Sequence, residues 1–162
     1  MAQGKLNPLA LLAVVALALL AGCGGNDGTT GTQRVEIGGE TFTLELAMTG
    51  DAREQGLSDR DFIAPDGGML FVFPRERELQ FVMRRCLVPI DILFLGPSGK
   101  VIAAHAMEVE PYERTDKDLK KYGSNGRSPI AIELAGGTIE RLGVEVGDQI
   151  ELPILELKRR AE

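Results

Sequence analysis

The chain has 162 residues, of which 44% are hydrophobic and 26% are charged, a balance typical of one ordinary globular domain. Its net charge is −6, and it contains no cluster of Lys or Arg long enough to follow a phosphate backbone. These features argue against nucleic acid as a partner.

The first 22 residues predict a signal peptide for export. One lysine, Lys5, precedes an apolar run over residues 8–20, which is too short to span a bilayer comfortably as a permanent anchor. The sequence Leu20-Ala21-Gly22-Cys23 at its end closely resembles the bacterial lipoprotein box. The resemblance implies cleavage before Cys23 and attachment of acyl chains, such as palmitate, to its thiol and new amino group. An ordinary signal peptide that leaves Cys23 unmodified is the alternative.

A short polar segment separates this predicted anchor from the domain. Residues 24–32, with the sequence GGNDGTTGT, are expected to form a flexible tether behind the lipidated Cys23. Because Gly24 stands where retention at an inner membrane usually requires Asp, we expect the outer membrane in a cell with two membranes. The globular domain, residues 33–157, is predicted to lie in the cell envelope on the periplasmic or extracellular side. Residues 158–162 are predicted to form a basic, solvated tail.

The first part of the domain is predicted to be a β-hairpin followed by a short helix. Apolar and polar residues alternate over residues 34–37 and 41–48, on either side of a Gly38-Gly39 turn. Asp51 is placed to cap a helix over residues 52–57, and the polar, turn-rich stretch after it predicts a surface loop.

Three short apolar runs predict the centre of a β core. Charged or turn-forming residues separate them, and each has the length of a strand. The runs are Met69–Phe73, Leu79–Met83 and Ile90–Leu95. A turn over residues 96–99 then returns the chain in a second hairpin over residues 100–106, and residues 109–128 predict a long loop.

The last part of the domain completes the predicted sheet. It contains a strand over residues 130–134, a helical turn over 138–142 capped by Thr138, and a last strand over 149–152 that extends towards Leu157. The chain is therefore predicted to form one mainly antiparallel β domain with one or two short helices. Because a closed sheet has no exposed edges, we expect it to be closed, or nearly closed, into a barrel.

Asp91 is the most unusual residue of the predicted core. It lies between two isoleucines in an apolar strand, where a carboxylate must face a polar site, find a partner or be partly protonated. Pairing outward from the 96–99 turn places Asp91 opposite Ala104, next to His105. Asp91 is either a structural carboxylate that accepts hydrogen bonds or a member of a functional site.

A polar patch at the mouth of the β core is the candidate ligand-binding site. It contains Met83, Arg84, Asp91 and His105, and it would bind a small ligand or a peptide. A charged rim that only fixes the strand register is the alternative. The predicted function is therefore a tethered accessory module that binds a small ligand or an envelope protein.

Catalysis is the alternative function. A hydrolase or transferase would use Cys86 as the nucleophile beside His105, with Asp91 as the orienting carboxylate. The chain has no Gly-x-Ser-x-Gly motif, and a pleated hairpin provides no helix N-terminus that would lower the pKa of the thiol. The catalytic residues are left unassigned.

The composition also argues against a metal site. One histidine and one cysteine besides Cys23 are too few for zinc, and no carboxylate spacing resembles a calcium-binding loop. We therefore expect no metal and no cofactor.

Several motifs together resemble the signature of one family. They are GGMLFVF at residues 67–73, Phe81-Val82-Met83, PIDILFLGPSGKV at residues 89–101, and RLGVEVGD ending at Asp148. Their sequence and order are similar to the domain-of-unknown-function 192 family, which implies a compact, mostly β domain and no established activity. The chain departs from the family at residues 81–86, where members commonly have Phe-Trp-Met-Lys-Asn-Thr. A ligand that stacks on that tryptophan would not be held in the same way here.

Overall fold

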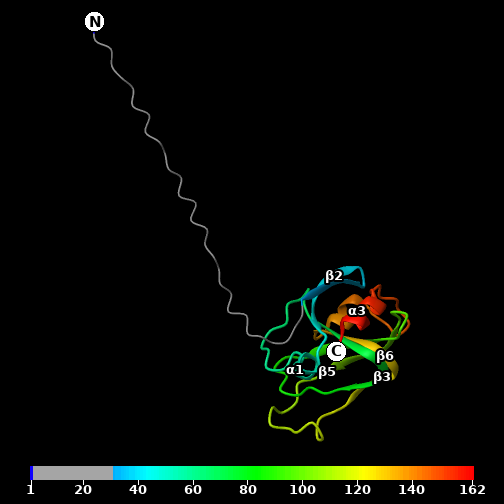
Figure 1. Ribbon diagram of the computed structural model, residues 1–162. Coiled ribbons are helices and arrows are strands. Elements are labelled where there is room, and N and C mark those ends of the chain that lie inside the picture. Colours follow the sequence, from blue (N-terminus) through cyan, green and yellow to red (C-terminus); the bar gives the residue numbers. More distant parts are fainter. Residues whose placement is uncertain (2–30) are drawn as a thin grey trace.

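The computed structural model describes Met1 and residues 31–162, so the predicted signal peptide and Cys23 lie outside the described residues. The described part folds into one β-rich domain (Figure 1). Its strands are β1 (Thr32–Ile37), β2 (Glu40–Ala47), β3 (Met69–Phe81), β4 (Ile90–Leu95), β5 (Val101–Met107) and β6 (Tyr122–Ala135). Its helices are α1 (Gly50–Gln55), α2 (Thr138–Leu142) and α3 (Ile154–Arg160). Within the described residues, none of these helices is long and apolar enough to cross a membrane.

The strands form one sheet in the order β1-β2-β3-β6-β4-β5, and every neighbouring pair is antiparallel except the parallel pair β2 and β3. The prediction of a mainly antiparallel β domain with short helices is confirmed. The predicted closure into a barrel is wrong, because β1 and β5 are the two edges of the sheet and do not pair. Part of the β5 edge is covered instead by residues 147–150, which exchange backbone hydrogen bonds with Gly99 and Val101.

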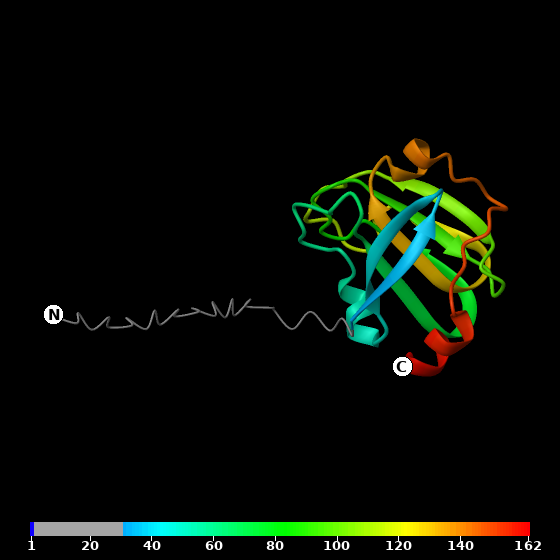
Figure 2. The same cartoon turned by 90° about the horizontal axis from the view of Figure 1, so that it is seen from above.

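Apolar side chains cover both faces of the sheet. All six residues of β4 are buried, as expected for a strand with packing on each side. One face packs against Ile154 and Leu157 of α3, and the opposite face packs against Ala52 of α1. Figure 2 shows the β1–β2 hairpin crossing the longer strands, with α3 beside β3.

The β1–β2 hairpin forms as predicted. Gly38 and Gly39 both have positive φ angles, 57° and 82°, which is the conformation of a two-residue primed turn. The helix that follows is capped differently from the prediction, because Thr49 Oγ1 accepts the hydrogen bond from the Ala52 amide at 3.2 Å. Asp51 lies inside the first turn of α1 instead.

The long strand β3 replaces two predicted strands and the turn between them. The charged stretch Pro74–Glu78 continues the strand, and the register with β6 shifts between Val72 and Arg77 and again between Glu78 and Gln80. Such irregularities bend a strand and accommodate a proline, which has no amide hydrogen to donate. The bend gives β3 a curved surface beside α1. The predicted 109–128 loop is correspondingly shorter, because β6 begins at Tyr122.

The C-terminal segment forms a helix where a strand was predicted. After Pro153, Ile154 and Leu157 lie three residues apart and both are buried against the sheet. Lys158, from the predicted basic tail, forms an ion pair with Glu76 at 2.8 Å. Thr138, the predicted cap of α2, is its first residue, and Gly137 occupies the cap position.

Candidate functional site

The structure gives Asp91 a backbone partner. Its side chain is 1% exposed, and Oδ2 accepts a hydrogen bond of 2.7 Å from the amide of Ile139 in α2. The predicted register is wrong: a shift between Phe94 and Leu95 places Asp91 opposite Ala106, two residues further along β5. Asp91 therefore ties α2 to the sheet.

His105 lies on the other face of the sheet from Asp91. It pairs with Ile92, and its Nε2 lies 2.8 Å from the carbonyl oxygen of Gly123. Its ring packs between Phe94 and Tyr122, with centroid distances of 6.0 and 5.7 Å. Since neighbouring positions in a strand point to opposite faces, the structure does not bring Asp91 and His105 together.

Cys86 is buried as a neutral thiol. Burial, together with the charges of Glu133 and Asp59, raises the pKa of the thiol to about 12. The Sγ–H group donates to the carbonyl oxygen of Arg84 at 3.6 Å. A thiol in this environment is a poor nucleophile, because the reactive form is the thiolate.

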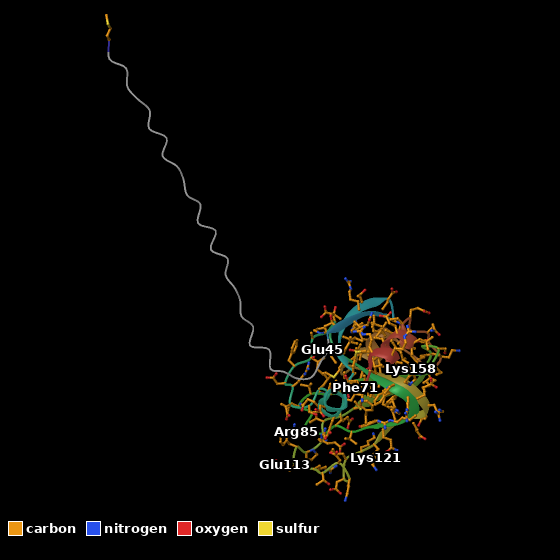
Figure 3. The ribbon with its side chains drawn as sticks, viewed as in Figure 1. Glu45, Phe71, Arg85, Glu113, Lys121 and Lys158 are labelled. Atoms are coloured by element: carbon orange, nitrogen blue, oxygen red, sulfur yellow. The ribbon has the colours of Figure 1, made fainter. Side chains whose placement is uncertain are left out.

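Met83 and Arg84 follow the end of β3, with Met83 fully buried and Arg84 half-buried. Arg84 Nη2 donates to the carbonyl oxygen of Glu54, and Nη1 lies 3.4 Å from Asp116 Oδ2 and 3.5 Å from Glu54 Oε1. Arg84 therefore joins α1 to the loop that carries Asp116. Figure 3 shows that Arg85 and Glu113 mark the loops at this end of the domain, whereas Phe71 lies inside it.

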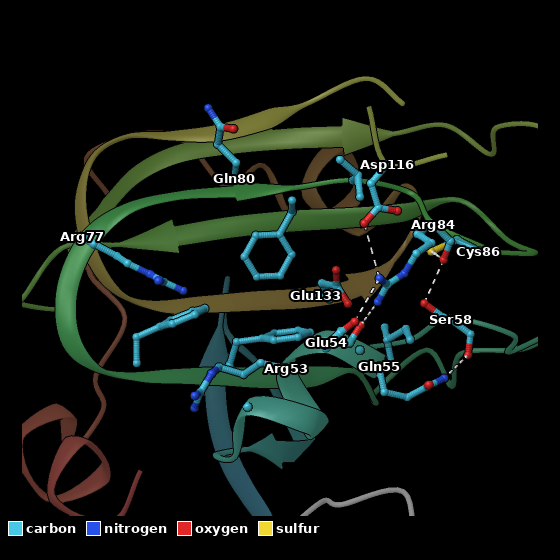
Figure 4. Close-up of a pocket in the computed structure, with 17 residues that line it drawn as sticks. Arg53, Glu54, Gln55, Ser58, Arg77, Gln80, Arg84, Cys86, Asp116 and Glu133 are labelled. Carbon is cyan, nitrogen blue, oxygen red and sulfur yellow. Dashed lines mark hydrogen bonds and ion pairs between the residues drawn. The ribbon is translucent and has the colours of Figure 1, made fainter. Parts of the chain in front are cut away.

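A cavity of about 350 Å³ lies between α1 with its following turn and the curved surface of β3. Its size is within the range of small-ligand sites. It is lined by Gly50, Arg53, Glu54, Gln55, Gly56, Leu57, Ser58, Phe71, Phe73, Arg77, Gln80, Phe81, Val82, Arg84, Cys86, Asp116 and Glu133. In Figure 4, Arg77 and Arg84 lie at opposite ends of this pocket, with Glu133 between them.

Glu133 forms the floor of the pocket. It lies on β6 between Met69 of β3 and Ile92 of β4, and its side chain faces the α1 side of the sheet. The residue is only 5% exposed, and its Oε2 has no hydrogen-bond partner among the described residues. The turn at Gly56 covers the carboxyl closely, since a Cβ atom there would lie 3.7 Å from Oε2.

Burial keeps Glu133 largely protonated at neutral pH. It raises the pKa of this carboxyl to about 8, although the charge of Arg60 and the Leu57 amide act in the opposite direction. Glu133 was not predicted as a site residue, yet the pattern that marked Asp91 is present here too. Glu133 lies between Ile132 and Leu134 in an apolar strand.

Three phenylalanine rings form the apolar wall of the pocket. Phe81 packs edge-to-face on Phe71 and Phe73, with centroid distances of 5.0 and 6.5 Å. The guanidinium carbons of Arg53 and Arg77 lie 5.3 and 5.2 Å from the centroid of the Phe73 ring. The pocket therefore combines an aromatic wall, a cationic end and a carboxyl floor. Among the described residues, no three His, Cys, Asp or Glu side chains are grouped so that they could hold a metal ion.

The family model of domain of unknown function 192, described as an uncharacterized ACR, matches residues 33–152. The chain belongs to the domain-of-unknown-function 192 family. The departure from the family pattern falls at the pocket of this member, because Val82, Arg84 and Cys86 all line it.

Two solved structures are similar to this domain-of-unknown-function 192 protein. A Sinorhizobium meliloti protein described as a candidate transcription regulator is 35% identical, with a TM-score of 0.61, over 73% of this chain and 89% of that chain. A Novosphingobium aromaticivorans protein of unknown function is 29% identical, with a TM-score of 0.65, over 75% of this chain and 84% of that chain. Among curated proteins, none matches the chain.

Proposed function

We propose that this protein is a binding module of the cell envelope, which is anchored by a lipidated Cys23 and holds a small ligand in the pocket between α1 and β3. The observation that carries the proposal is the unpartnered Oε2 of Glu133 on the floor of the pocket. A buried polar atom without a partner costs about 1–3 kcal/mol, and such atoms are rare in folded proteins. A ligand that exchanges a hydrogen bond with Glu133 would recover this free energy.

Binding is also favoured over catalysis by the placement of the reactive groups. The three residues that a Cys-His-Asp mechanism would need are distributed over both faces of the sheet, and only Cys86 lines the pocket. The pocket itself is already built, with packed aromatic rings and fixed arginines. A preformed apolar cavity with a few converging polar groups is the usual form of a small-ligand site.

The proposal of a lipid anchor is supported by the sequence Leu20-Ala21-Gly22-Cys23 and by the polar stretch after it. The net charge of −6 disfavours binding of the domain itself to an anionic lipid surface, so the acyl chains would hold the protein at the membrane. Growth of the expressing cells with an alkyne-tagged palmitate tests this part. We expect labelling of the full chain and none of the Cys23→Ala variant, and equal labelling of both would refute the anchor.

Native mass spectrometry tests ligand binding. The full chain is extracted in mild detergent, and its native mass is compared with its denatured mass. We expect an excess mass that disappears on denaturation. The Glu133→Leu variant, which removes the carboxyl from the floor of the pocket, should lose this mass. Glu78→Leu is the matched control, because Glu78 is an exposed glutamate of β3 that does not line the pocket. An excess mass that Glu133→Leu retains, or no excess mass in any of the three proteins, would refute binding in this pocket.

A further inference from the structure

The charges around the pocket also point to the class of ligand. We infer that the pocket takes a small organic anion, whose carboxylate or phosphate group lies against Arg77 and whose apolar body places a neutral polar group beside Glu133. This inference rests on the proposed function, since it names the ligand of the same pocket.

Arg77 brings a positive charge to one end of the pocket. The guanidinium carbons of Arg53 and Arg77 lie 5.3 and 5.2 Å from the centroid of the same ring, that of Phe73. Burial, and then the like charge of Arg77, lowers the pKa of Arg53. An anion beside Arg77 would offset this repulsion, and guanidinium groups match carboxylate and phosphate oxygens well.

No side-chain carboxylate within the described residues forms an ion pair with either of these arginines. Arg53 donates to the backbone carbonyl oxygens of Met48 and Val72 and to the terminal carboxylate of Glu162, so its position is fixed and its charge is already paired. Arg77 is exposed, lines the pocket and lies over the Phe73 ring. At the other end, Arg84 is already paired with Glu54 and Asp116. The charge available to an anion in the pocket is therefore that of Arg77.

The floor of the pocket is suited to a neutral polar group. Glu133 is 95% buried, and its Oε2 has no hydrogen-bond partner in the part of the chain that the structure describes. Because a carboxyl in this setting is mostly protonated at pH 7, it would not repel an anion elsewhere in the pocket. It can donate its O–H to an acceptor on the ligand or accept a hydrogen bond on its second oxygen.

The wall between the two polar ends is aromatic. Phe71, Phe73 and Phe81 are packed edge-to-face, and they offer ring faces and edges to an apolar or aromatic body. A cavity of about 350 Å³ accommodates one ring with short substituents. The three parts of the pocket thus match a ligand with one anionic end, one ring and one hydroxyl or carbonyl group.

Four matched probes test the inference on the Cys23→Ala chain at pH 7. The anions are 4-hydroxyphenylacetate and phenyl phosphate, the neutral probe is methyl 4-hydroxyphenylacetate, and the cation is tyramine. Binding is followed by the chemical shifts of the Gly56 and Leu57 amides, which line the pocket. We expect at least one of the two anions to bind about tenfold or more tightly than both the ester and tyramine. The anion that binds more tightly shows whether the pocket prefers a carboxylate or a phosphate.

Arginine variants locate the anionic end. Arg77→Gln should reduce anion binding to the level of the ester. Arg75→Gln is the matched control, since Arg75 is an exposed arginine of the same strand that does not line the pocket. It should leave the preference for the anion unchanged.

The outcomes separate this inference from the proposed function. Tighter binding of the ester or of tyramine, or an anion preference that survives in Arg77→Gln, overturns the assignment of an anionic ligand while the pocket remains a binding site. Probes that leave the pocket amides unchanged at millimolar concentration also overturn it. If the full chain then also lacks an excess native mass, the proposed function fails as well.

Discussion

Replacing Glu133 by Gln is expected to change the pH dependence of stability more than any other conservative substitution in the sheet. Burial raises the pKa of Glu133 from its ordinary value of 4.5 to about 8 in the folded protein. Below pH 4.5 the carboxyl is protonated in both the folded and the unfolded chain, so it does not make the stability depend on pH. Between pH 4.5 and pH 8 only the unfolded chain releases the proton, and the free energy of unfolding therefore falls as the pH rises.

The magnitude follows from the size of this pKa difference. At about 1.36 kcal/mol per unit of pKa, the free energy of unfolding decreases, relative to its value below pH 4.5, by roughly 5 kcal/mol above pH 8 and by roughly 3 kcal/mol at pH 7. Glutamine has nearly the same shape but does not ionise. The stability of Glu133→Gln relative to the parent chain should therefore increase by up to about 1.4 kcal/mol per pH unit between pH 5 and pH 8.

Urea unfolding, followed by circular dichroism on the Cys23→Ala background, measures this difference at several pH values. The carboxylates that the two proteins share cancel in the comparison. Glu78→Gln, which removes an exposed glutamate from β3, controls for the change in net charge. A relative stability that stays constant with pH, or that decreases as the pH rises, would show that Glu133 is ionised and partnered in the folded protein.

Three further predictions concern the packing around the site. Asp91→Ala should destabilise the domain by about 1–3 kcal/mol in urea unfolding, because the amide of Ile139 loses its acceptor; an unchanged midpoint would refute that role. Gly68→Ala should cost about 3–5 kcal/mol, since a Cβ atom there would lie 2.2 Å from a backbone oxygen of β6, whereas Gly50→Ala, with open space around it, should have little effect. Equal effects of the two glycine substitutions would contradict this packing. Native Cys86, with its pKa of about 12, should react with iodoacetamide roughly a thousandfold more slowly than in the urea-unfolded chain, and equal rates would refute its burial.

The parts of the fold that were predicted correctly are specified by local sequence. The Gly38-Gly39 turn requires positive φ angles that glycine adopts without strain, so the hairpin around it could be recognised from six or seven residues. The strand β4 was predicted with its observed bounds, because its apolar run ends at the Gly96–Gly99 turn. Each of these elements is determined by residues that are neighbours in the chain.

The errors arose where distant segments decide the structure. The charged residues of Pro74–Glu78 are typical of a turn, but pairing with β6 keeps them in one bent strand. Ile154 and Leu157 fit a strand or a helix equally well over so short a segment. Their packing against the sheet, after Pro153 has ended the preceding segment, selects the helix.

At the candidate site too, neighbouring residues identify the unusual side chains, whereas segments distant in the sequence decide their roles. Both Asp91 and Glu133 stand out in sequence as carboxylates within apolar strands, and that pattern alone does not distinguish them. Asp91 receives its partner from Ile139, which is 48 residues away in the chain. Glu133 faces the opposite side of the sheet, where its Oε2 has no partner among the described residues and α1 and β3 leave a cavity.

This contrast separates a structural role from a functional one. A carboxylate retained for the fold is expected to be hydrogen-bonded by the protein, as Oδ2 of Asp91 is by the Ile139 amide of α2. The raised pKa of Glu133 is expected to lower stability at neutral pH, and Oε2 gains no hydrogen bond in return. A residue that is costly to the empty protein is best explained by what it contributes when the pocket is occupied, as in other sites where stability is reduced for the sake of function. On this reasoning, a variant that improves the free domain by making position 133 apolar should at the same time lose its ligand.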